Sequence, residues 1–197
     1  MKKIIVDILL FILMLLEFQR TYLPPEIHEI IGICLIILVI IHLLLNRKYI
    51  KAIPKGKYNA KRSLTLIINV GFFITFTLTV MFGILSSQDI LTFFNIKNMT
   101  IIYLHKIFGN LSLILLGMHL GTNLKLKYKK SLNVVYILII LFGIYSIVRL
   151  DFWNHLIGNY GFSMMTGNIL INSIEYLSII LMITILTNCL KCKISNK

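Results

Sequence analysis

Charged residues are scarce in this chain, and acidic residues are the scarcest. Only seven of the 197 residues are aspartate or glutamate, and charged residues of all types make up 14% of the sequence, against 58% for hydrophobic residues. The apolar residues gather in long runs and do not alternate with polar ones. This pattern leaves little room for a soluble core, and it predicts a polytopic membrane protein in contact with lipid.

Cysteine is also scarce, which excludes several kinds of redox site. Three cysteines provide neither a disulfide framework nor the thiolates of an iron–sulfur cluster. Cys189 and Cys192 form a lone C-x2-C, and no histidine follows Cys192, so covalent c-type haem attachment is excluded. Two roles stay open for this pair, either ordinary reduced thiols or a redox or intersubunit metal site. No nucleotide-binding fingerprint or flavin domain is recognisable.

Six apolar segments are long enough to cross a bilayer, and backbone polar groups in lipid must be satisfied within each segment, so each span is expected to be helical. The first segment resembles a signal peptide. Asp7 and Glu17 interrupt it and no A-x-A-like cleavage site follows, so we expect a retained span. The expected fold is an all-α helical bundle, a single transmembrane domain over residues 1–197. The six expected spans cover about residues 3–21, 25–46, 63–86, 100–122, 132–150 and 168–190.

The net charge of +13 is concentrated on one side of these spans. Only Arg20, Lys97, Lys106 and Arg149, of twenty basic residues, lie at or near the other side. By the positive-inside rule the basic side is cytoplasmic, and both termini are expected there, in a cytoplasmic membrane. Basic loops beside anionic lipid headgroups account for the charge, so we expect no nucleic-acid partner. The basic side carries Lys2, Lys3, Arg47, Lys48, Lys51, Lys55, Lys57, Lys61, Arg62, Lys125, Lys127, Lys129, Lys130, Lys191, Lys193 and Lys197.

Four of the five histidines form two pairs with identical spacing. His28 and His42 are fourteen residues apart, as are His105 and His119. Fourteen helical residues rise about 21 Å and turn about 40° short of four circuits, so each pair lies on one helix face, near opposite ends of a bilayer core. The blocks HEIIGICLIILVIIHLLLN and HKIFGNLSLILLGMHLGTN, which begin at the outer histidines, both reduce to H-x3-G-x9-H-x3-N. This repeat indicates one kind of site built twice.

The expected topology places the two histidine segments in the same direction. Both run from outside to inside, so His28 and His105 share an outer level, and His42 and His119 share an inner level. Parallel helices with histidines at matched heights are what two bis-histidine haems require, because each iron takes one axial imidazole from each helix. We therefore expect two b-type haems in a four-helix core over about residues 1–125, followed by two additional spans.

Small and polar residues recur at fixed distances from these histidines. Gly32 and Gly109, each four residues beyond an outer histidine, are expected to make room for a porphyrin against the backbone. Asn46 and Asn123 lie four residues beyond the inner histidines, where two roles fit: contact with haem propionates, or capping of the helix end. Basic residues that could face propionates, or alternatively lipid, are Arg47, Lys48 and Lys125 inside and Arg20, Lys106 and Arg149 outside.

Three further polar residues have roles that spacing leaves open. His155 lies in the outer connection DFWNHLIGNYGF, where it either packs at the membrane interface or faces a quinone or a protein partner. Glu175, in the outer half of the last span, either pairs with Arg149 or accepts a proton from a quinol. Glu17 and Arg20 are three residues apart and are expected to satisfy each other.

The paired H-x13-H segments resemble the dihaem core of respiratory cytochrome b proteins and of ferric-reductase-like membrane proteins. A closer resemblance is to the flavinylation-associated cytochrome family, a group of small bacterial membrane proteins. It is carried by IIHLLLN at 40–46, by MHLGTN at 118–123, and by FGI at 82–84, where members tend to have Ser-Gly-Ile. The resemblance covers roughly residues 5–125.

This chain departs from that family at two positions. Members often carry a further histidine where Asn123 stands and a tryptophan where Arg47 stands, and neither departure removes a ligand. The resemblance implies a bacterial electron-transfer subunit, or a quinol-linked oxidoreductase, that passes electrons from quinol or a cytosolic-side donor to an extracytoplasmic flavin-bearing protein. We expect no flavin on the chain itself, since no flavin-binding pattern is present.

Two other function classes stay open. A metal or proton transporter could use four intramembrane histidines, but it is expected to carry midplane carboxylates and broken helices, whereas these histidines lie at two distinct levels. A membrane anchor or assembly subunit of a redox complex is also compatible with the composition. That alternative leaves the repeated H-x3-G-x9-H pattern unexplained.

Overall fold

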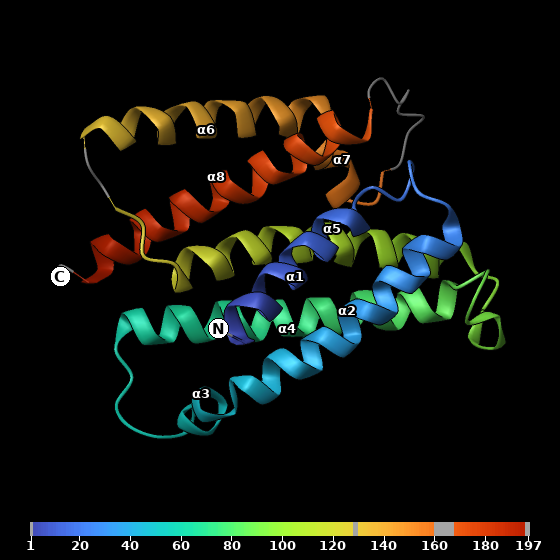
Figure 1. The fold of residues 1–197 in the computed structure, drawn as a ribbon, viewed down its shortest axis with the longest axis horizontal. Helices are drawn as coiled ribbons and strands as arrows, with labels where there is room; N and C mark the ends of the chain where they lie inside the picture. The colour runs from blue at the N-terminus through green and yellow to red at the C-terminus, as the bar shows by residue number, and fades with distance from the viewer. Residues whose placement is uncertain (1, 128–129, 160–167, 196–197) are drawn as a thin grey trace.

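The computed structural model describes residues 2–127, 130–159 and 168–195. Helices make up most of this part of the chain, and no strand occurs within it, so the expected all-α fold class is confirmed. Figure 1 shows the course of the chain. The elements are α1 (Lys2–Glu17), α2 (Pro25–Leu45), α3 (Arg47–Ala52), α4 (Ala60–Ser86), the 3-10 turn η1 (Thr92–Phe94), α5 (Met99–Asn123), α6 (Lys130–Arg149), α7 (Phe152–Leu156) and α8 (Ile169–Ser195).

Among the described residues, five helices are long and apolar enough to cross a membrane, namely α2, α4, α5, α6 and α8. The protein is therefore a multi-pass membrane protein, and five of the six expected spans correspond to these helices. α1 has sixteen residues, about 24 Å at 1.5 Å per residue, which is short of roughly 30 Å of hydrocarbon. The expected first span extends to residue 21, but α1 ends at Glu17. The chain turns there, and the backbone amide of Gln19 donates to the Leu16 carbonyl at 2.9 Å.

α1 and α2 form an antiparallel hairpin. Lys3 near the start of α1 donates to Asn46 just beyond α2 at 3.1 Å, and Glu17 at the end of α1 lies beside His28 in the first turns of α2. Pro25 is the first residue of α2, a position where a missing amide hydrogen costs no helical hydrogen bond. The hairpin thus places α2, which carries two histidines, alongside α1, which carries two carboxylates.

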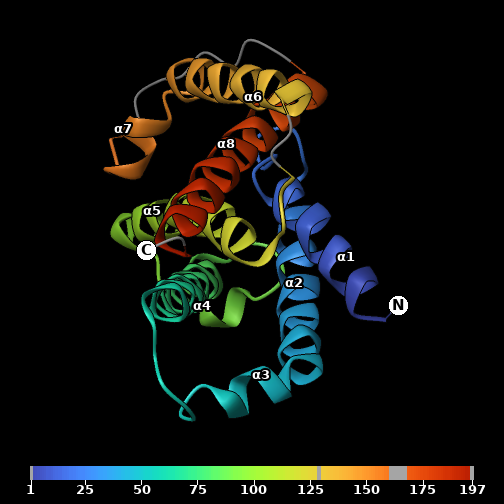
Figure 2. The same cartoon turned by 90° about the vertical axis from the view of Figure 1, so that its left-hand side faces the viewer.

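The remaining long helices form a bundle with α8 near its centre. α5 runs antiparallel to α4 and packs against α8, whose other side packs against α6. In Figure 2, α6, α8, α5 and α4 follow one another from top to bottom, and the α1–α2 hairpin lies beside them. The side chains of Leu113, Ile179 and Ile180 are completely buried in the core, which Met14 of α1 and Leu35 of α2 also join.

α2 is set apart from the bundle by more than the ordinary distance between packed helices. Among the described helices it packs extensively only against α1 and α3, whereas α4 and α5 pack extensively against each other. Helices in direct contact have axes about 8–10 Å apart. The axis of α2 lies farther than this from the axes of α4 and α5, so any contact between them needs side chains that span the wider gap. This separation places the candidate site between the two helix pairs.

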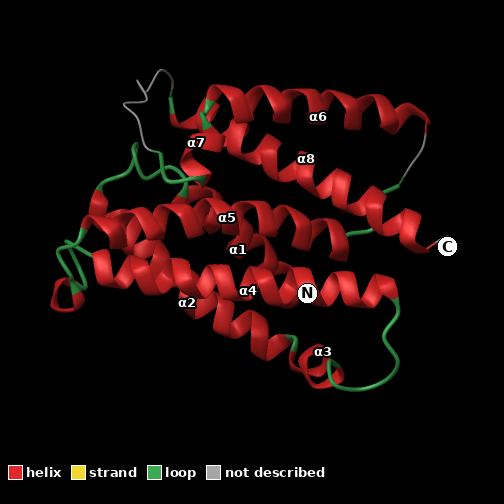
Figure 3. Ribbon diagram, turned by 180° about the vertical axis from the view of Figure 1, so that it is seen from behind, coloured by secondary structure: helices red, strands yellow, loops and turns green. Residues whose placement is uncertain are grey.

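The two ends of the bundle differ in chemistry. One end gathers α3, the start of α4, and the ends of α5 and α8, where Lys191 donates to the Thr122 carbonyl. The opposite end holds the α1–α2 turn, η1 and α7, as Figure 3 shows. At the first end, the Arg62 guanidinium donates to the carbonyls of Ala52 at 2.7 Å and Lys55 at 2.6 Å. These bonds fix the position of the basic segment between α3 and α4.

Gly117 and Gly121 let α5 approach α8 closely. A Cβ at Gly121 would lie 2.6 Å from the Thr184 carbonyl oxygen, and a Cβ at Gly117 would lie 3.0 Å from the Ile180 carbonyl oxygen. Small residues four apart on one helix face are typical of tightly packed transmembrane helix pairs. The Thr184 hydroxyl donates to the Gly117 carbonyl at 3.1 Å, a bond between helices that requires this close approach.

We expect Gly121→Ala to destabilise the protein by about 1–3 kcal/mol, because the added methyl group has no room against the α8 backbone. Gly71→Ala in α4 is the matched control, since a Cβ there would meet Leu115 at an ordinary 3.9 Å. It should be neutral or slightly stabilising, because alanine favours a helix more than glycine does. Chemical or thermal unfolding of the detergent-solubilised variants measures both effects, and equal stability of the two would contradict this account of the α5–α8 contact.

Candidate functional site

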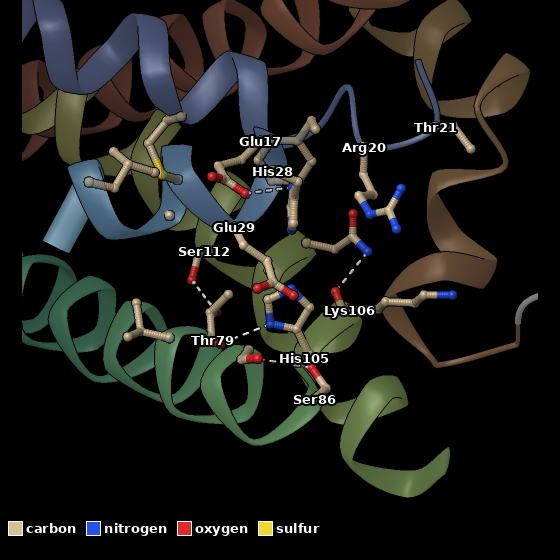
Figure 4. Close-up of a pocket in the computed structure, with 18 of the residues that line it drawn as sticks. Glu17, Arg20, Thr21, His28, Glu29, Thr79, Ser86, His105, Lys106 and Ser112 are labelled. Carbon is tan, nitrogen blue, oxygen red and sulfur yellow. Dashed lines mark hydrogen bonds and ion pairs between the residues drawn. The ribbon is translucent and has the colours of Figure 1, made fainter. Parts of the chain in front are cut away.

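The structure brings His28 of α2 and His105 of α5 together near the end that carries η1 and α7. Their ring centres are 6.1 Å apart, and their planes are nearly perpendicular at 87°. Figure 4 shows the two rings pointing toward each other from opposite helices. Both side chains are partly buried, so the pair lies inside the protein rather than on its lipid-facing surface.

Each of these rings has an acceptor beside its Nδ1 atom. His105 Nδ1 is 2.8 Å from the backbone carbonyl oxygen of Thr79 in α4, and His28 Nδ1 is 2.8 Å from Glu17 Oε2 in α1. The second contact has an ion-pair distance without standard hydrogen-bond geometry. An acceptor at Nδ1 places the ring proton there and leaves Nε2 as the basic nitrogen. The two rings therefore border one cavity, and each could offer its Nε2 atom to a metal.

Glycines surround the outer pair. A Cβ at Gly83 would lie 3.0 Å from His105 Cε1 and 3.1 Å from its Nδ1, so Gly83 allows the ring to reach the Thr79 carbonyl. Gly32 and Gly109 are more open, with the nearest atoms to an added Cβ at 3.6 and 3.8 Å. All three line the cavity beside the histidines. Gly83 is the glycine of the FGI segment, and this contact is a physical reason for a glycine there.

A cavity of about 820 Å³ lies between the α1–α2 hairpin and the bundle. Both outer histidines line it, with walls from α1, α2, α4, α5 and α8. Arg20, Lys106 and Arg149, expected on sequence grounds at the outer side, also line this cavity. The space is thus of the size of a cofactor pocket, with basic side chains and potential metal ligands in its walls.

Glu29, the residue after His28, fixes another part of the cavity wall. Its carboxylate accepts from the Ser87 hydroxyl at 2.7 Å and from the backbone amides of Gln88 and Ile90 at 2.9 and 2.7 Å. Ser87 and Gln88 line the cavity themselves. One carboxylate therefore joins the first turns of α2 to the connection that follows α4, and it holds the backbone next to His28 in place.

The inner histidines have a similar arrangement around Nδ1. His42 Nδ1 is 2.7 Å from Asp7 Oδ1 of α1, and His119 Nδ1 is 2.9 Å from Asn69 Oδ1 of α4. The His119 ring also packs on Phe72, with ring centres 5.6 Å apart. Unlike the outer pair, these histidines do not line the cavity between α2 and the bundle.

The asparagines of the repeated pattern contact their own helices. Asn46 Nδ2 donates to the His42 carbonyl at 2.9 Å and lies 3.3 Å from His42 Nε2. Asn123 Nδ2 donates to the His119 carbonyl at 2.7 Å. Both bonds satisfy carbonyls near a helix C-terminus, as capping requires. The structure shows this contact for both asparagines, and contact with a propionate stays a prediction.

No protein-family model, no curated protein and no solved structure matches this chain. The functional argument therefore depends on the residues of the site. The resemblance carried by the histidine segments stays a prediction.

The acceptors around the four rings were not identified from the sequence as parts of the site. Asp7 and Glu17 were noted only as interruptions of an apolar run, and Glu17 was expected to pair with Arg20, whereas the structure places it against His28. The sequence does indicate that Asp7 and Glu17 have partners inside the protein, because a carboxylate in an apolar helix requires one. Asn69 is also a polar residue in an apolar helix, so the sequence indicates less strongly that it has a partner. The Thr79 acceptor is a backbone carbonyl, which the sequence does not distinguish from any other.

The other residues with open roles are placed as follows. Glu175 is 2% exposed and forms an ion pair with Arg149, which is one of its two expected roles. His155 lines the cavity, and burial lowers the pKa of its imidazole below its ordinary value. Cys189 and Cys192 lie near the end of α8 and are not joined in a disulfide. Nothing in their surroundings distinguishes the two roles considered for them.

We expect Arg149→Met to lower the thermal unfolding midpoint clearly, because it leaves the buried Glu175 carboxylate without its arginine. The double variant Arg149→Met/Glu175→Leu should recover most of the loss, since it removes both charges and restores apolar packing. Thermal unfolding in detergent measures both. A double variant that is no more stable than the single one would show that the ion pair is not what holds this end of α6 and α8.

Proposed function

We propose that this protein is a dihaem b-type cytochrome that carries electrons between the two faces of a membrane. The observation that carries the proposal is the facing pair His28 and His105, whose Nδ1 atoms lie beside acceptors and whose rings line a cavity of about 820 Å³. A second histidine pair with the same spacing on the same two helices extends the argument to a second haem.

The separation of the two rings suits a metal between them. A metal–nitrogen bond of about 2.0 Å and about 1.1 Å from that nitrogen to the ring centre place the centres of two collinear imidazoles about 6.2 Å apart. The measured separation is 6.1 Å. Among the described residues, no three or more His, Cys, Asp or Glu side chains surround a common point, as a protein-only metal site would need. An iron that brings four equatorial nitrogens in a porphyrin needs only two imidazoles.

The cavity walls fit the rest of a haem. Gly32 and Gly109 remove side-chain bulk from two helices that face the space, and apolar side chains supply much of the remaining wall. Arg20, Lys106 and Arg149 line the cavity where carboxylate groups of a porphyrin could bind basic side chains. These residues would hold the haem through its ligands, its flat faces and its two acidic groups.

The inner level has the same ligand types but a tighter local arrangement. Asn46 Nδ2 lies 3.3 Å from His42 Nε2, the nitrogen that a metal would use. The same amide group donates to the His42 carbonyl at 2.9 Å, so it can keep that bond while the ring turns away. Binding at this level would require a side-chain adjustment of His42, because Asn46 Nδ2 lies beside its Nε2.

When bound, a haem would supply a one-electron ferric–ferrous couple, and two histidines would hold its iron, which would favour electron transfer over oxygen chemistry. The protein residues position the two couples at levels about 21 Å apart along the helices. The remaining residues orient the imidazoles, surround the porphyrin with apolar groups and exclude water. This arrangement provides a path for electrons across most of the hydrocarbon region.

We extend the proposal to orientation and partners. The basic end of the bundle faces the cytoplasm of a bacterium, since basic loops are retained on that side. Electrons enter from quinol or a cytosolic-side donor, and they leave to an extracytoplasmic flavin-bearing protein. The support for the flavoprotein is the resemblance of residues 40–46 and 118–123 to flavinylation-associated cytochromes, together with the lack of any flavin-binding pattern in this chain.

We expect two haems per chain in the purified protein, with the spectrum of low-spin b-type haem, because four histidines supply two complete axial pairs. Haem extraction and protein quantification after expression with adequate haem supply measure this ratio. Zero haem would contradict the proposed function.

Ligand variants provide the matched comparison for that measurement. His28→Ala and His105→Ala should each remove or disturb the same outer haem, whereas His42→Ala and His119→Ala should act on the inner one. Phe93→Ala is the control, because Phe93 is 92% exposed and does not line the cavity. Loss of different haems from His28→Ala and His105→Ala would contradict the pairing by level.

We also expect the reconstituted protein to carry electrons across a lipid bilayer. Vesicles that contain an impermeant reductant, with ferricyanide outside, should reduce the ferricyanide faster than protein-free vesicles do. His42→Ala and His28→Ala should both slow this reaction, because each interrupts one level of the path. A wild-type rate equal to that of protein-free vesicles, in protein shown to contain haem, would rule out transmembrane conduction and favour an anchor role.

A further inference from the structure

Both acidic residues of α1 lie beside histidines of α2. Asp7 Oδ1 is 2.7 Å from His42 Nδ1, and Glu17 Oε2 is 2.8 Å from His28 Nδ1. No other acidic residue occurs in α1. The antiparallel hairpin therefore matches each carboxylate of one helix with one imidazole of the other.

The histidines of α5 have neutral partners instead. His105 Nδ1 faces the Thr79 carbonyl oxygen, and His119 Nδ1 faces Asn69 Oδ1. Each level thus combines one imidazole beside a carboxylate with one imidazole beside a neutral oxygen. The same asymmetry occurs twice, and in both cases the carboxylate comes from α1.

A carboxylate at Nδ1 changes what the imidazole does at Nε2. It fixes the tautomer and the ring orientation, and it makes Nε2 a stronger electron donor to a metal. It also places a negative charge near the metal, which favours the ferric state because that state carries one more positive charge than the ferrous state. Inside a membrane protein this charge is weakly screened. Both effects lower the reduction potential of the haem at that level.

A purely structural role for Asp7 and Glu17 explains less. Neutral asparagine or glutamine could accept the same contacts and hold the hairpin, whereas a carboxylate in an apolar helix is costly. α1 is shorter than the five candidate spans, and both of its carboxylates lie beside histidines of α2. The feature that requires explanation is the negative charge at both histidines of α2.

On the basis of the proposed function, we propose that Asp7 and Glu17 are positioning residues that orient the α2 imidazoles and lower the reduction potentials of the two haems, one at each level. α1 then serves as an element that tunes the two redox centres. The Glu17 side chain is 17% exposed and the Asp7 side chain is 52% exposed, so we expect the larger effect at the outer level, where screening is weaker.

Asp7→Asn and Glu17→Gln test this proposal, because each keeps an oxygen acceptor and removes the charge. Redox titration followed by absorbance should show a raised outer potential in Glu17→Gln and a raised inner potential in Asp7→Asn. We expect at least a tenfold change in the ferric-to-ferrous ratio at a fixed potential for Glu17→Gln, which is about 59 mV for a one-electron couple. His28→Ala and His42→Ala assign each potential to its level.

The control is Glu26→Gln, which removes an exposed negative charge two residues before His28 and should shift neither potential. Unchanged potentials in both test variants, equal shifts at both levels, or the same shift in the control would overturn the proposal. If a variant loses haem, loss confined to the nearer level supports it, and equal loss at both levels overturns it. Wild-type protein without haem defeats the proposed function and this inference together, whereas two haems with unmoved potentials defeat this inference alone.

Discussion

Each of the four paired imidazoles places its Nδ1 atom beside an oxygen acceptor from a neighbouring helix, and these contacts position the helices around both histidine pairs. The four acceptors come from two helices only, α1 for the histidines of α2 and α4 for those of α5. The protein thus contains two antiparallel helix pairs, each made of a helix with two histidines and a helix with oxygen acceptors. The cavity lies between the pairs, and the rings of His28 and His105 both line it.

The two histidine pairs differ in the side chains and the open space around them. At the outer level, Gly83 admits the His105 ring and Glu29 fixes the backbone beside His28, while an open cavity borders both rings. At the inner level, the Asn46 amide and the Phe72 ring occupy the immediate surroundings of the histidines. A repeated sequence pattern therefore has two different local structures, because the residues that decide the difference lie outside the pattern.

Much of the arrangement follows from sequence alone, and the exceptions have identifiable physical causes. Apolar runs predict the five spans, and the shared direction of the two histidine segments predicts that His28 faces His105. The end of α1 was misplaced because Phe18 continues the apolar pattern past the turn, so composition does not mark it. The Thr79 acceptor is a backbone carbonyl, which no side-chain identity reveals. Asp7 and Glu17 were visible as carboxylates in an apolar segment, but their partners depend on the register of a hairpin that periodicity does not specify.

The α1–α2 hairpin also bears on how the chain enters a membrane during synthesis. An aspartate at the centre of an isolated helix opposes insertion by about 2.5–3.5 kcal/mol, and α1 carries two carboxylates. Their partners His28 and His42 lie on α2, which leaves the ribosome after α1. α1 is therefore expected to stay at the membrane–water interface until α2 has been synthesised. The two helices then enter the lipid together as one hairpin. The contacts that orient the imidazoles would then also set the order in which the first two helices are inserted.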